Sequence, residues 1–424
     1  MVNRTLPQWL SWISALHSEV IDLSLDRIRQ VAQKLEVLQF SCPVITVGGT
    51  NGKGSTVATL AAIYNAAGYR CGVYTSPHLL HHNERIVVAG KMVSDAELCE
   101  AFQVVEAARG SISLTYFEYS TLAALVLFQK SALDVVILEV GLGGRLDAVN
   151  IIDSDVAIVT TVDWDHMDWL GTTLDAIGYE KAGIFRANTP ALYGDSEPVM
   201  SVINSAKDKN AVLFLRDRDF GYEDAGLDWH WQSKTVHYAH LPKPRVLLSN
   251  AALALQAITL LQVQLPLKLE AIQRGLSEVC VPGRFEKIRQ QPNCIIDVAH
   301  NPQASRMLYQ QLSTLGWQGQ LHIVFSMLAT KDRIASLLPW QECAAKWYLA
   351  PLNADNAASL ESISADFEAV GITSYQKYGT IGDAYGAALQ NAGVAETVLV
   401  FGSFHTVAEV LQQDCNYSPT SVGL

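Results

Sequence analysis

The sequence predicts an α/β protein of two domains, each built on a mainly parallel β-sheet. Short apolar runs alternate with segments of helical periodicity along most of the 424 residues, and this alternation is typical of parallel sheets. A glycine-rich turn joins the first such run to a helical segment, and a second strand–helix series begins near residue 287. We therefore expect an N-terminal domain over residues 1–286 and a smaller, Rossmann-like domain over 287–424.

The expected elements of the first domain follow from local patterns. Apolar spacing predicts helices over 6–16, 26–38, 55–67, from 95 onward, and over 116–129, 173–185 and 250–261. Gly68 ends the third of these helices, and a capping box of Ser94 and Glu97 opens the fourth. Apolar, often β-branched runs predict buried strands at 43–47, 71–75, 134–140 and 156–162. The stretch from 187 to 245 mixes strand-like pieces with turn residues, and its layout stays open.

The second domain is expected to begin after a polar, proline-containing stretch. Predicted strands lie at 294–298, 321–325, 347–349 and 397–401, with a helix at 303–315 and another at the C-terminal end. A cleft between two α/β domains is a common place for a ligand site. We expect the functional site there.

Composition limits the classes of partner. The chain has 30 Lys plus Arg against 42 Asp plus Glu, a formal net charge of −12, which argues against a general nucleic-acid surface. An odd number of cysteines (seven) and the absence of a C-x-x-C pair indicate reduced thiols. The sequence shows neither a secretory signal nor an apolar run of 18 residues. We expect a cytoplasmic protein with no membrane partner.

The strongest motif is the glycine-rich turn from Val47 to Thr56. Glycines let several N–H groups face one point, the following helix adds its positive end, and a lysine can reach the outer phosphates. The spacing differs from the usual phosphate loop, because Val47 stands at the first glycine position and Gly54 follows the lysine. An ordinary glycine turn is the alternative. We predict an ATP-binding loop made of Thr50, Asn51, Gly52, Lys53, Gly54 and Ser55.

Polar residues follow three of the predicted strands. They are Ser76, Glu139 and His166, at the sheet edge where α/β proteins bind ligands. Magnesium prefers such oxygen-rich sites, and the hydroxyl of Ser55 could reach the same ion. Glu139 could instead be a hydrogen-bonded structural acid, and His166 an ordinary polar residue.

Four further candidates lie at helix or strand ends. Asn250 opens a predicted helix and could be its N-cap. Arg284 stands at the domain junction, where its guanidinium could bind phosphate. Asp297 and His300 close the first strand of the second domain, and His405, at the end of the last strand, is a weaker candidate for holding an incoming amino acid.

The segment Gly49–Ser55 resembles the ATP loop of the Mur ligase superfamily, specifically its folylpolyglutamate synthase branch. The other motifs match that branch in order, from about residue 22 to 405. The resemblance implies a P-loop ATPase-type domain like the central Mur ligase domain, followed by a Rossmann-like domain. Among the residues singled out above, it implies catalytic roles for Lys53, Glu139, His166 and His300.

The resemblance also implies a set of ligands. Ser76, Glu139 and His166 correspond to magnesium ligands, with two ions expected and a monovalent cation as a further cofactor. Asn250, Arg284 and Asp297 correspond to nucleotide contacts. Lys181, in Glu180–Phe185, corresponds to a carbamylated lysine with a catalytic role, whereas the residues alone would suggest only an exposed or phosphate-binding lysine.

Three segments resemble those that bind dihydropteroate in bifunctional bacterial dihydrofolate synthases. An acid with aromatic neighbours suits a flat heterocycle, although Tyr116 and Phe117 would also fit a hydrophobic core. The residues carried over are Asp22, Leu23, Ser24, Leu25, Thr115, Tyr116, Phe117, Glu118, Leu146, Asp147 and Ala148.

The implied activity is ATP-dependent ligation of L-glutamate to dihydropteroate and to reduced folates, through an acyl phosphate, by a monomeric enzyme. A peptidoglycan ligase would share this chemistry but normally needs a further N-terminal domain, and only about 40 residues precede the loop here. A regulatory P-loop switch would not need a second domain whose strands end in His300 and His405. A non-catalytic nucleotide-binding module is disfavoured by the presence of Lys53, Glu139 and His166.

Overall fold

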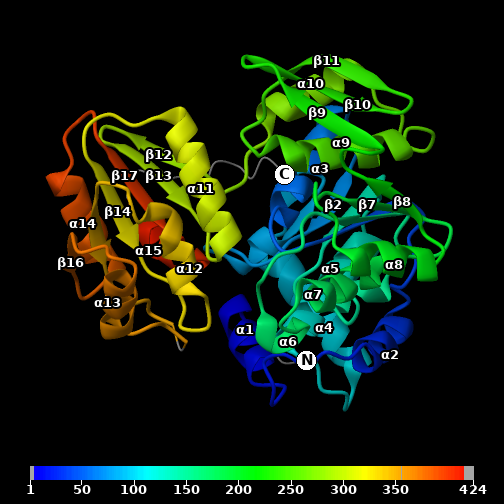
Figure 1. Cartoon of the computed structure of the whole chain (residues 1–424). Coiled ribbons are helices and arrows are strands. Elements are labelled where there is room, and N and C mark those ends of the chain that lie inside the picture. Colours follow the sequence, from blue (N-terminus) through cyan, green and yellow to red (C-terminus); the bar gives the residue numbers. More distant parts are fainter. Residues whose placement is uncertain (1–3, 355, 415–424) are drawn as a thin grey trace. The chain divides into compact units, whose positions relative to one another are not determined.

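The computed structural model describes residues 4–354 and 356–414, which form two compact units. The units divide between Cys280 and Val281, a few residues before the boundary expected from the sequence. The N-terminal unit contains an eight-stranded and a three-stranded sheet, and the C-terminal unit contains a six-stranded sheet (Figure 1). The predicted α/β class is confirmed.

The eight-stranded sheet is parallel from β2 to β8, and the short strands β3 and β4 add an antiparallel edge. Its central strands are buried along their whole length, which explains their continuous apolar sequences. In spatial order the strands are β4 (Lys91–Met92), β3 (Ile86–Val88), β2 (Cys71–Tyr74), β5 (Val135–Glu139), β1 (Val44–Gly48), β6 (Val156–Val159), β7 (Pro190–Tyr193) and β8 (Val212–Leu215).

The helices of this unit include all seven that were predicted, together with three that were not, at 167–170, 200–208 and 269–278. They are α1 (Leu6–Ser14), α2 (Asp26–Leu35), α3 (Lys53–Ala66), α4 (Asp95–Arg109), α5 (Tyr116–Gln129), α6 (Met167–Leu170), α7 (Leu174–Lys181), α8 (Met200–Asp208), α9 (Leu248–Leu260) and α10 (Leu269–Glu278). The capping box before α4 is present, with the Glu97 N–H donating to Ser94 Oγ (3.3 Å). The helix predicted to reach residue 185 ends at Lys181 and continues as a 3₁₀ turn, η3 (Ala182–Ile184).

Helix α3 is enclosed on nearly every side. All of residues 55–64 are buried, and α3 packs against both α9 and α10. A side chain at Gly275 of α10 would come within 2.5 Å of the Ile63 backbone, so the glycine permits this close helix contact. The helix that follows the glycine-rich turn is therefore a fixed part of the core.

The stretch that the sequence left open contains β7, α8 and β8, and then a three-stranded antiparallel sheet of β9 (Phe220–Asp224), β10 (Asp228–Ser233) and β11 (His237–Pro242). Trp229 and Trp231 of β10 are fully buried. The Trp231 indole N–H donates to the Ala252 carbonyl of α9 (3.1 Å). The small sheet is thus attached to α9.

The C-terminal unit has one sheet in the order β12 (Glu286–Gln290), β13 (Asn293–Asp297), β17 (Thr397–Phe401), β14 (Leu321–Phe325), β15 (Ala345–Leu349) and β16 (Tyr375–Lys377). All pairs are parallel except β12–β13. The helices are α11 (Pro302–Leu315), α12 (Arg333–Leu337), α13 (Leu360–Ala369), α14 (Ile381–Asn391) and α15 (Phe404–Gln413). Within the described ranges, no helix of either unit is long and apolar enough to cross a membrane.

Candidate active site

The glycine-rich turn has a backbone that only glycine accommodates at two positions. Gly49 and Gly52 have φ angles of +138° and +87°. A Cβ atom at Gly49 would lie 1.8 Å from Thr160 Oγ1, and one at Gly52 would lie 2.4 Å from Asn250 Oδ1. The turn therefore packs backbone against its neighbours directly before the N-terminus of α3, an arrangement that fits phosphate.

Hydrogen bonds fix the conformation of this turn. The Lys53 ammonium donates to the carbonyl oxygens of Gly49 (3.0 Å) and Thr50 (3.1 Å). Thr50 Oγ1 donates to the Asp163 carbonyl (3.1 Å) and accepts from the Asp163 N–H (3.0 Å). The Asn51 N–H donates to Thr161 Oγ1 (3.0 Å). The turn is thereby attached to the segment after β6.

Asn250 lies against this turn and is not an N-cap. The N-cap residue of α9 is Leu247, and Asn250 stands in the first helical turn with its side chain facing Gly52. The capping interpretation is therefore wrong. The position beside the glycine-rich turn fits the expected nucleotide contact.

Glu139 ends the buried strand β5 and is itself buried. Its Oε2 accepts a hydrogen bond from the Ser76 N–H (3.1 Å). A Cβ at Gly54 would lie 3.7 Å from Oε1, so the carboxylate faces the first turn of α3, where Ser55 is also buried. The structure thus places the Glu139 carboxylate between the Ser76 backbone and the start of α3, and a carboxylate is a ligand that suits magnesium.

His166 follows β6 and precedes the short helix α6. It has a left-handed backbone (φ +53°), and its side chain is 44% exposed. Its Nε2 lies 3.9 Å from Asp165 Oδ2. The side chain of Asp165 is almost completely buried, although we had assigned it no role from the sequence.

Lys181, the last residue of α7, is buried beside other charged groups. Burial and, secondarily, the positive charge of Lys53 lower the pKa of Lys181 to about 7, against the opposing effect of Asp165 and Asp147. The pKa of Asp147 is raised to about 6 by burial, although it accepts the N–H groups of Leu142 (2.8 Å) and Val149 (3.0 Å). A lysine with this pKa is largely neutral at mildly alkaline pH.

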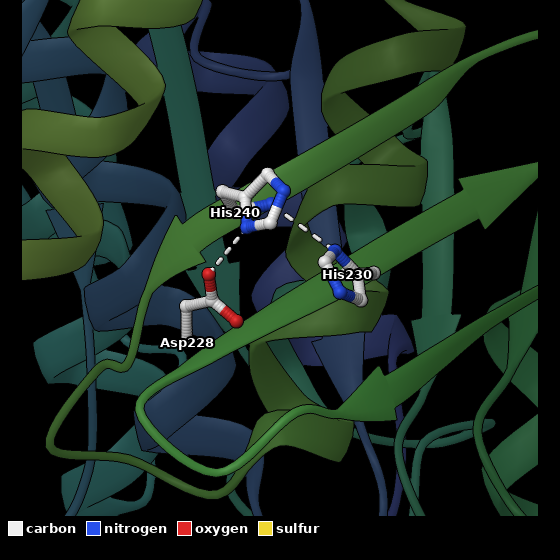
Figure 2. Close-up of side chains that lie close together, drawn as sticks. All are labelled: Asp228, His230 and His240. Carbon is white, nitrogen blue, oxygen red and sulfur yellow. Dashed lines mark hydrogen bonds and ion pairs between the residues drawn. The ribbon is translucent and has the colours of Figure 1, made fainter.

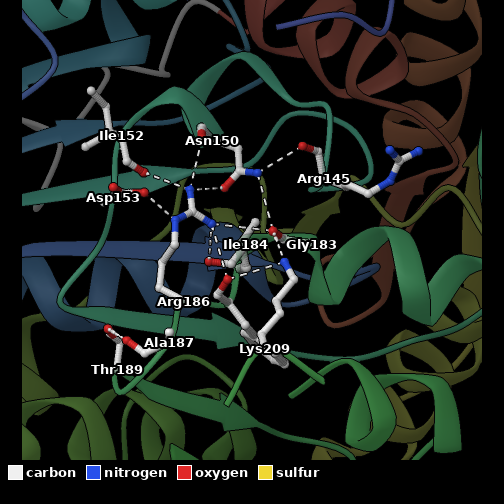
Figure 3. A network of polar contacts seen from close by, with 11 residues as sticks. Arg145, Asn150, Ile152, Asp153, Gly183, Ile184, Arg186, Ala187, Thr189 and Lys209 are labelled. Carbon is white, nitrogen blue, oxygen red and sulfur yellow. Dashed lines mark hydrogen bonds and ion pairs between the residues drawn. The ribbon is translucent and has the colours of Figure 1, made fainter. Parts of the chain in front are cut away.

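Two cations that we did not single out in the sequence hold the segment after Lys181 (Figure 3). Arg186 donates to the carbonyl oxygens of Asn150 (3.0 Å) and Ile184 (3.0 Å) and pairs with Asp153. Lys209 donates to the Gly183 carbonyl (2.7 Å). These contacts join the chain after α7 to η2 (Ala148–Ile151), which begins at the last of the predicted substrate residues Leu146, Asp147 and Ala148. Both cations position backbone.

Two of the segments predicted to bind a pterin meet at Arg27. Its guanidinium pairs with Asp22 Oδ2 (2.6 Å) and with Glu118 Oε1 (3.2 Å). Leu23, Ser24 and Leu25 form the half-buried turn before α2, in which Ser24 Oγ accepts the Asp26 N–H (3.3 Å). Glu118 also completes a capping box with Thr115. The structure therefore brings 22–25 and 115–118 together through an arginine that sequence reasoning missed.

Tyr116 and Phe117 have both core-type and site-type features. The Tyr116 hydroxyl hydrogen-bonds His82 Nδ1 (2.7 Å), and the guanidinium of Arg85 lies 5.5 Å from the Tyr116 ring centre. Burial, with the nearby positive charge of Arg85, lowers the pKa of His82 to about 3, so the imidazole is neutral. The Phe117 ring packs on Gly141, where a Cβ would come within 2.5 Å of it. Neither aromatic residue is fully buried.

In the C-terminal unit, the predicted residues gather at the carboxyl ends of β13 and β17. Asp297 accepts the N–H groups of Phe285 (2.7 Å) and Ala299 (2.7 Å), and burial raises its pKa. The Arg284 guanidinium lies 5.6 Å from the ring centre of Phe404, and the His300 ring lies 5.8 Å from it. Phe404, which the sequence analysis did not single out, thus links Arg284 and His300. His405 is adjacent to it in the first turn of α15.

Comparison with known proteins agrees with both halves of this description. The family model of the Mur ligase middle domain matches residues 47–239, and the model of the Mur ligase glutamate ligase domain matches residues 283–404. The matched middle domain, which contains the glycine-rich turn, and the matched glutamate ligase domain together define an ATP-dependent ligase of the Mur ligase class.

Within this class, the chain belongs to the dihydrofolate synthase/folylpolyglutamate synthase family. It is 44% identical over 408 residues to the dihydrofolate synthase/folylpolyglutamate synthase of Escherichia coli, covering 96% of this chain and 95% of that protein. The corresponding protein of Haemophilus influenzae is 39% identical, with coverage of 95% and 96%.

Solved structures show the same fold. The structure of Escherichia coli FolC in complex with DHPP and ADP has a TM-score of 0.92 at 43% identity and covers 96% of this chain and 97% of its own. The bifunctional synthase of Yersinia pestis, complexed with AMPPNP and a Mn ion, has a TM-score of 0.92 at 44% identity, with coverage of 97% and 98%. The family and fold class expected from the motifs are thus confirmed.

Proposed function

We propose that this ligase joins L-glutamate to the carboxylate of dihydropteroate, giving dihydrofolate, and to the γ-carboxylate of reduced folylglutamates. The observation that carries the proposal is a combination. The glycine-rich turn suits phosphate, and relatives called dihydrofolate synthase/folylpolyglutamate synthase match nearly the whole chain. One related structure contains Mn, AMPPNP and L-glutamate, and another contains DHPP and ADP. A nucleotide, a divalent metal ion and L-glutamate are three of the components that the proposed reaction requires.

The chemistry requires an activated carboxylate, because a carboxylate and an ammonium ion do not condense in water. A carboxylate oxygen attacks the γ-phosphorus of ATP and forms the acyl phosphate. The bond between the γ-phosphorus and the oxygen that bridges it to the β-phosphate breaks, and ADP leaves with that oxygen and the electron pair. The glutamate amine then attacks the acyl carbon, and inorganic phosphate leaves. Catalysis of such steps is mainly positioning and charge stabilisation.

Residues of the N-terminal unit fit the nucleotide and its metal. The backbone of residues 50–55 and Asn250 would hold the phosphates, and Lys53 would stabilise their charge. Ser55, Ser76, Glu139 and His166 would hold two magnesium ions. Divalent ions neutralise the charge of the transferring phosphoryl group when they are bound. We include a monovalent cation among the cofactors on the family resemblance alone.

Residues of the C-terminal unit are proposed to act on the same reaction. Arg284 carries a positive charge for phosphate, and Asp297 would contact the nucleotide. His300 would stand near the reacting groups, and His405 would contact the incoming glutamate. The shared position of Asp297, His300 and His405 at the carboxyl ends of parallel strands supports the assignment.

Lys181 is proposed to be carbamylated. Carbon dioxide adds to a neutral amine, and a pKa of about 7 makes the neutral form available. The product is an anion, which removes the repulsion between Lys181 and Lys53 and offers an oxygen ligand. Without carbamylation, the buried ammonium would oppose Lys53.

The acceptor is proposed to contact the group formed by Asp22, Arg27 and Glu118, with Tyr116, Phe117 and the 146–148 segment. This group combines carboxylates, which accept N–H donors, with aromatic rings that suit a flat heterocycle. We further propose a monomeric, cytoplasmic enzyme. The cysteines within the described ranges are free thiols, which suits a reducing compartment.

The test is ADP release with dihydropteroate, with tetrahydrofolate and with neither acceptor, each with and without L-glutamate. Dependence of turnover on both an acceptor and glutamate supports ligation. Turnover without an acceptor would favour a nucleotide-hydrolysing switch instead. Mass spectrometry of the product shows whether one glutamate is added to each acceptor or several.

A further inference from the structure

The outer face of the three-stranded sheet carries a group of residues with the chemistry of metal ligands (Figure 2). Asp228 and His230 come from β10, and His240 comes from β11. One ligand atom of each residue lies within 4.8 Å of the others. None of the three belongs to the groups assigned to nucleotide, magnesium, glutamate or acceptor.

The strand pattern explains why these side chains share a face. Side chains alternate along a strand, so the burial of Trp229 and Trp231 directs Asp228 and His230 to the opposite face. On β11, the register shifts opposite the segment between Trp229 and Trp231. His240 lies at this bulge with a left-handed backbone (φ +53°).

This local geometry directs His240 towards the other two residues. A left-handed conformation is uncommon for a residue with a side chain, and bulges often re-aim one. As a result, His240 Nδ1 lies 2.6 Å from Asp228 Oδ2, and the His230 and His240 ring centres are 5.0 Å apart. An ordinary strand would not need this bulge, so the arrangement calls for an explanation.

In the structure, the lone pair of His230 that a metal ion would use is engaged in a hydrogen bond. Its Nδ1 accepts the His240 backbone N–H (3.1 Å), so in the neutral ring the proton is on Nε2 and a lone pair is on Nδ1. A metal ion would take this lone pair in place of the His240 backbone N–H. That N–H would then bond water, because His240 is exposed. Two imidazole nitrogens with one carboxylate oxygen suit Zn²⁺ and its first-row neighbours better than Mg²⁺ or Ca²⁺.

We propose that Asp228, His230 and His240 bind a divalent transition-metal ion, of which Zn²⁺ is the best match. Three protein ligands leave room for water to complete a tetrahedral shell. The ion would replace the direct contact between Asp228 Oδ2 and His240 Nδ1 and join β10 to β11. Because Trp231 ties β10 to α9, binding stabilises the small sheet on the helix that carries Asn250.

The test uses the full chain, freed of metal with EDTA and then desalted. Zn²⁺ alone is titrated calorimetrically in buffer with excess Mg²⁺, which occupies oxygen-rich sites first. We expect one Zn²⁺ ion per chain whose affinity falls at least about tenfold in His230→Ala and in His240→Ala, since each lacks one of three ligands. Co²⁺ in place of Zn²⁺ gives a visible absorption band that the same variants lose.

His237→Ala is the matched control, because His237 is an exposed histidine on β11 whose ring centre lies 6.4 Å from that of His230. It retains wild-type zinc affinity. If His230→Ala does not fold, two other variants test the site. His240→Ala changes an exposed side chain, and Asp228→Asn keeps the size of the side chain it replaces.

Two results would overturn the proposal. One is a wild-type chain that binds no Zn²⁺ below millimolar concentration. The other is zinc affinity that persists in folded His240→Ala and Asp228→Asn. Ligation measured without zinc is unchanged in these variants, so a failed zinc site does not bear on the proposed ligase activity.

Discussion

Replacement of Gly52 by alanine tests the proposed phosphate-binding role of the glycine-rich turn at its most restrictive point. Gly52 has φ +87°, and its new Cβ would lie 2.4 Å from Asn250 Oδ1. The left-handed backbone costs an alanine about 1–2 kcal/mol. Asn250 is buried, so moving its amide away costs about another 1 kcal/mol in lost polar contacts.

If the whole penalty of about 2–3 kcal/mol appears in nucleotide binding, kcat/KM for ATP falls about 30- to 150-fold. The assay is ADP release at saturating acceptor and glutamate over a range of ATP concentrations, together with urea unfolding. The matched control is Gly68→Ala. Gly68 has φ +90° just after α3, but a Cβ there meets nothing within 4 Å, so stability falls by a similar backbone term while the KM for ATP stays unchanged.

Two outcomes would refute this reasoning. Gly52→Ala with a wild-type KM for ATP would show that the turn does not hold the nucleotide. Equal changes in KM for Gly52→Ala and Gly68→Ala would show that only backbone strain matters, and that the contact with Asn250 does not.

Three further predictions concern the charged groups. Glu139→Gln, which keeps the side-chain size, lowers kcat about 100-fold or more and raises the Mg²⁺ concentration needed for half-maximal ADP release; an unchanged Mg²⁺ dependence would remove Glu139 as a metal ligand. The pKa of Lys181 in the folded state, about 7, lies below its ordinary value of 10.5. Between these two pH values the unfolded chain therefore binds more protons, and stability rises with pH. Urea unfolding in CO₂-free buffer at pH 7, 8 and 9 therefore shows a smaller rise for Lys181→Met than for the wild type, and an equal rise would contradict the burial effect. Arg27→Ala releases Asp22 and Glu118 and raises the KM for dihydropteroate about tenfold without changing the KM for ATP. Arg29 is an exposed arginine on the same helix, and Arg29→Ala changes neither KM. Equal effects of the two substitutions would show that Arg27 has no part in acceptor binding.

The parts of the fold that were predicted are those whose signals are local. The central strands are buried on both faces, so they appear as continuous apolar runs at 44–48, 135–139 and 156–159. Helix α5 was predicted at its observed bounds, because its sequence is largely apolar. The glycine-rich turn is also a local signal, because its glycines and lysine all lie within residues 48–54.

Other features depended on contacts that sequence spacing does not reveal. Arg27 pairs with Asp22 nearby and with Glu118, which lies 91 residues further along the chain, and nothing near Arg27 in the sequence marks it. Asn250 matched an N-cap by type, but the extended backbone at Leu247 (ψ 137°) starts the helix earlier. The small antiparallel sheet was missed because its strands are half exposed and irregular at the β10–β11 bulge.

The enclosure of α3 bears on how such an enzyme can be altered in the laboratory. Residues 55–64 are all buried, so almost any new side chain on this helix would disturb the packing around it. Random libraries that select for new acceptors will therefore keep α3 and its preceding turn intact. Successful changes will collect instead around the more open turn at 22–25, where neighbouring side chains have room to rearrange.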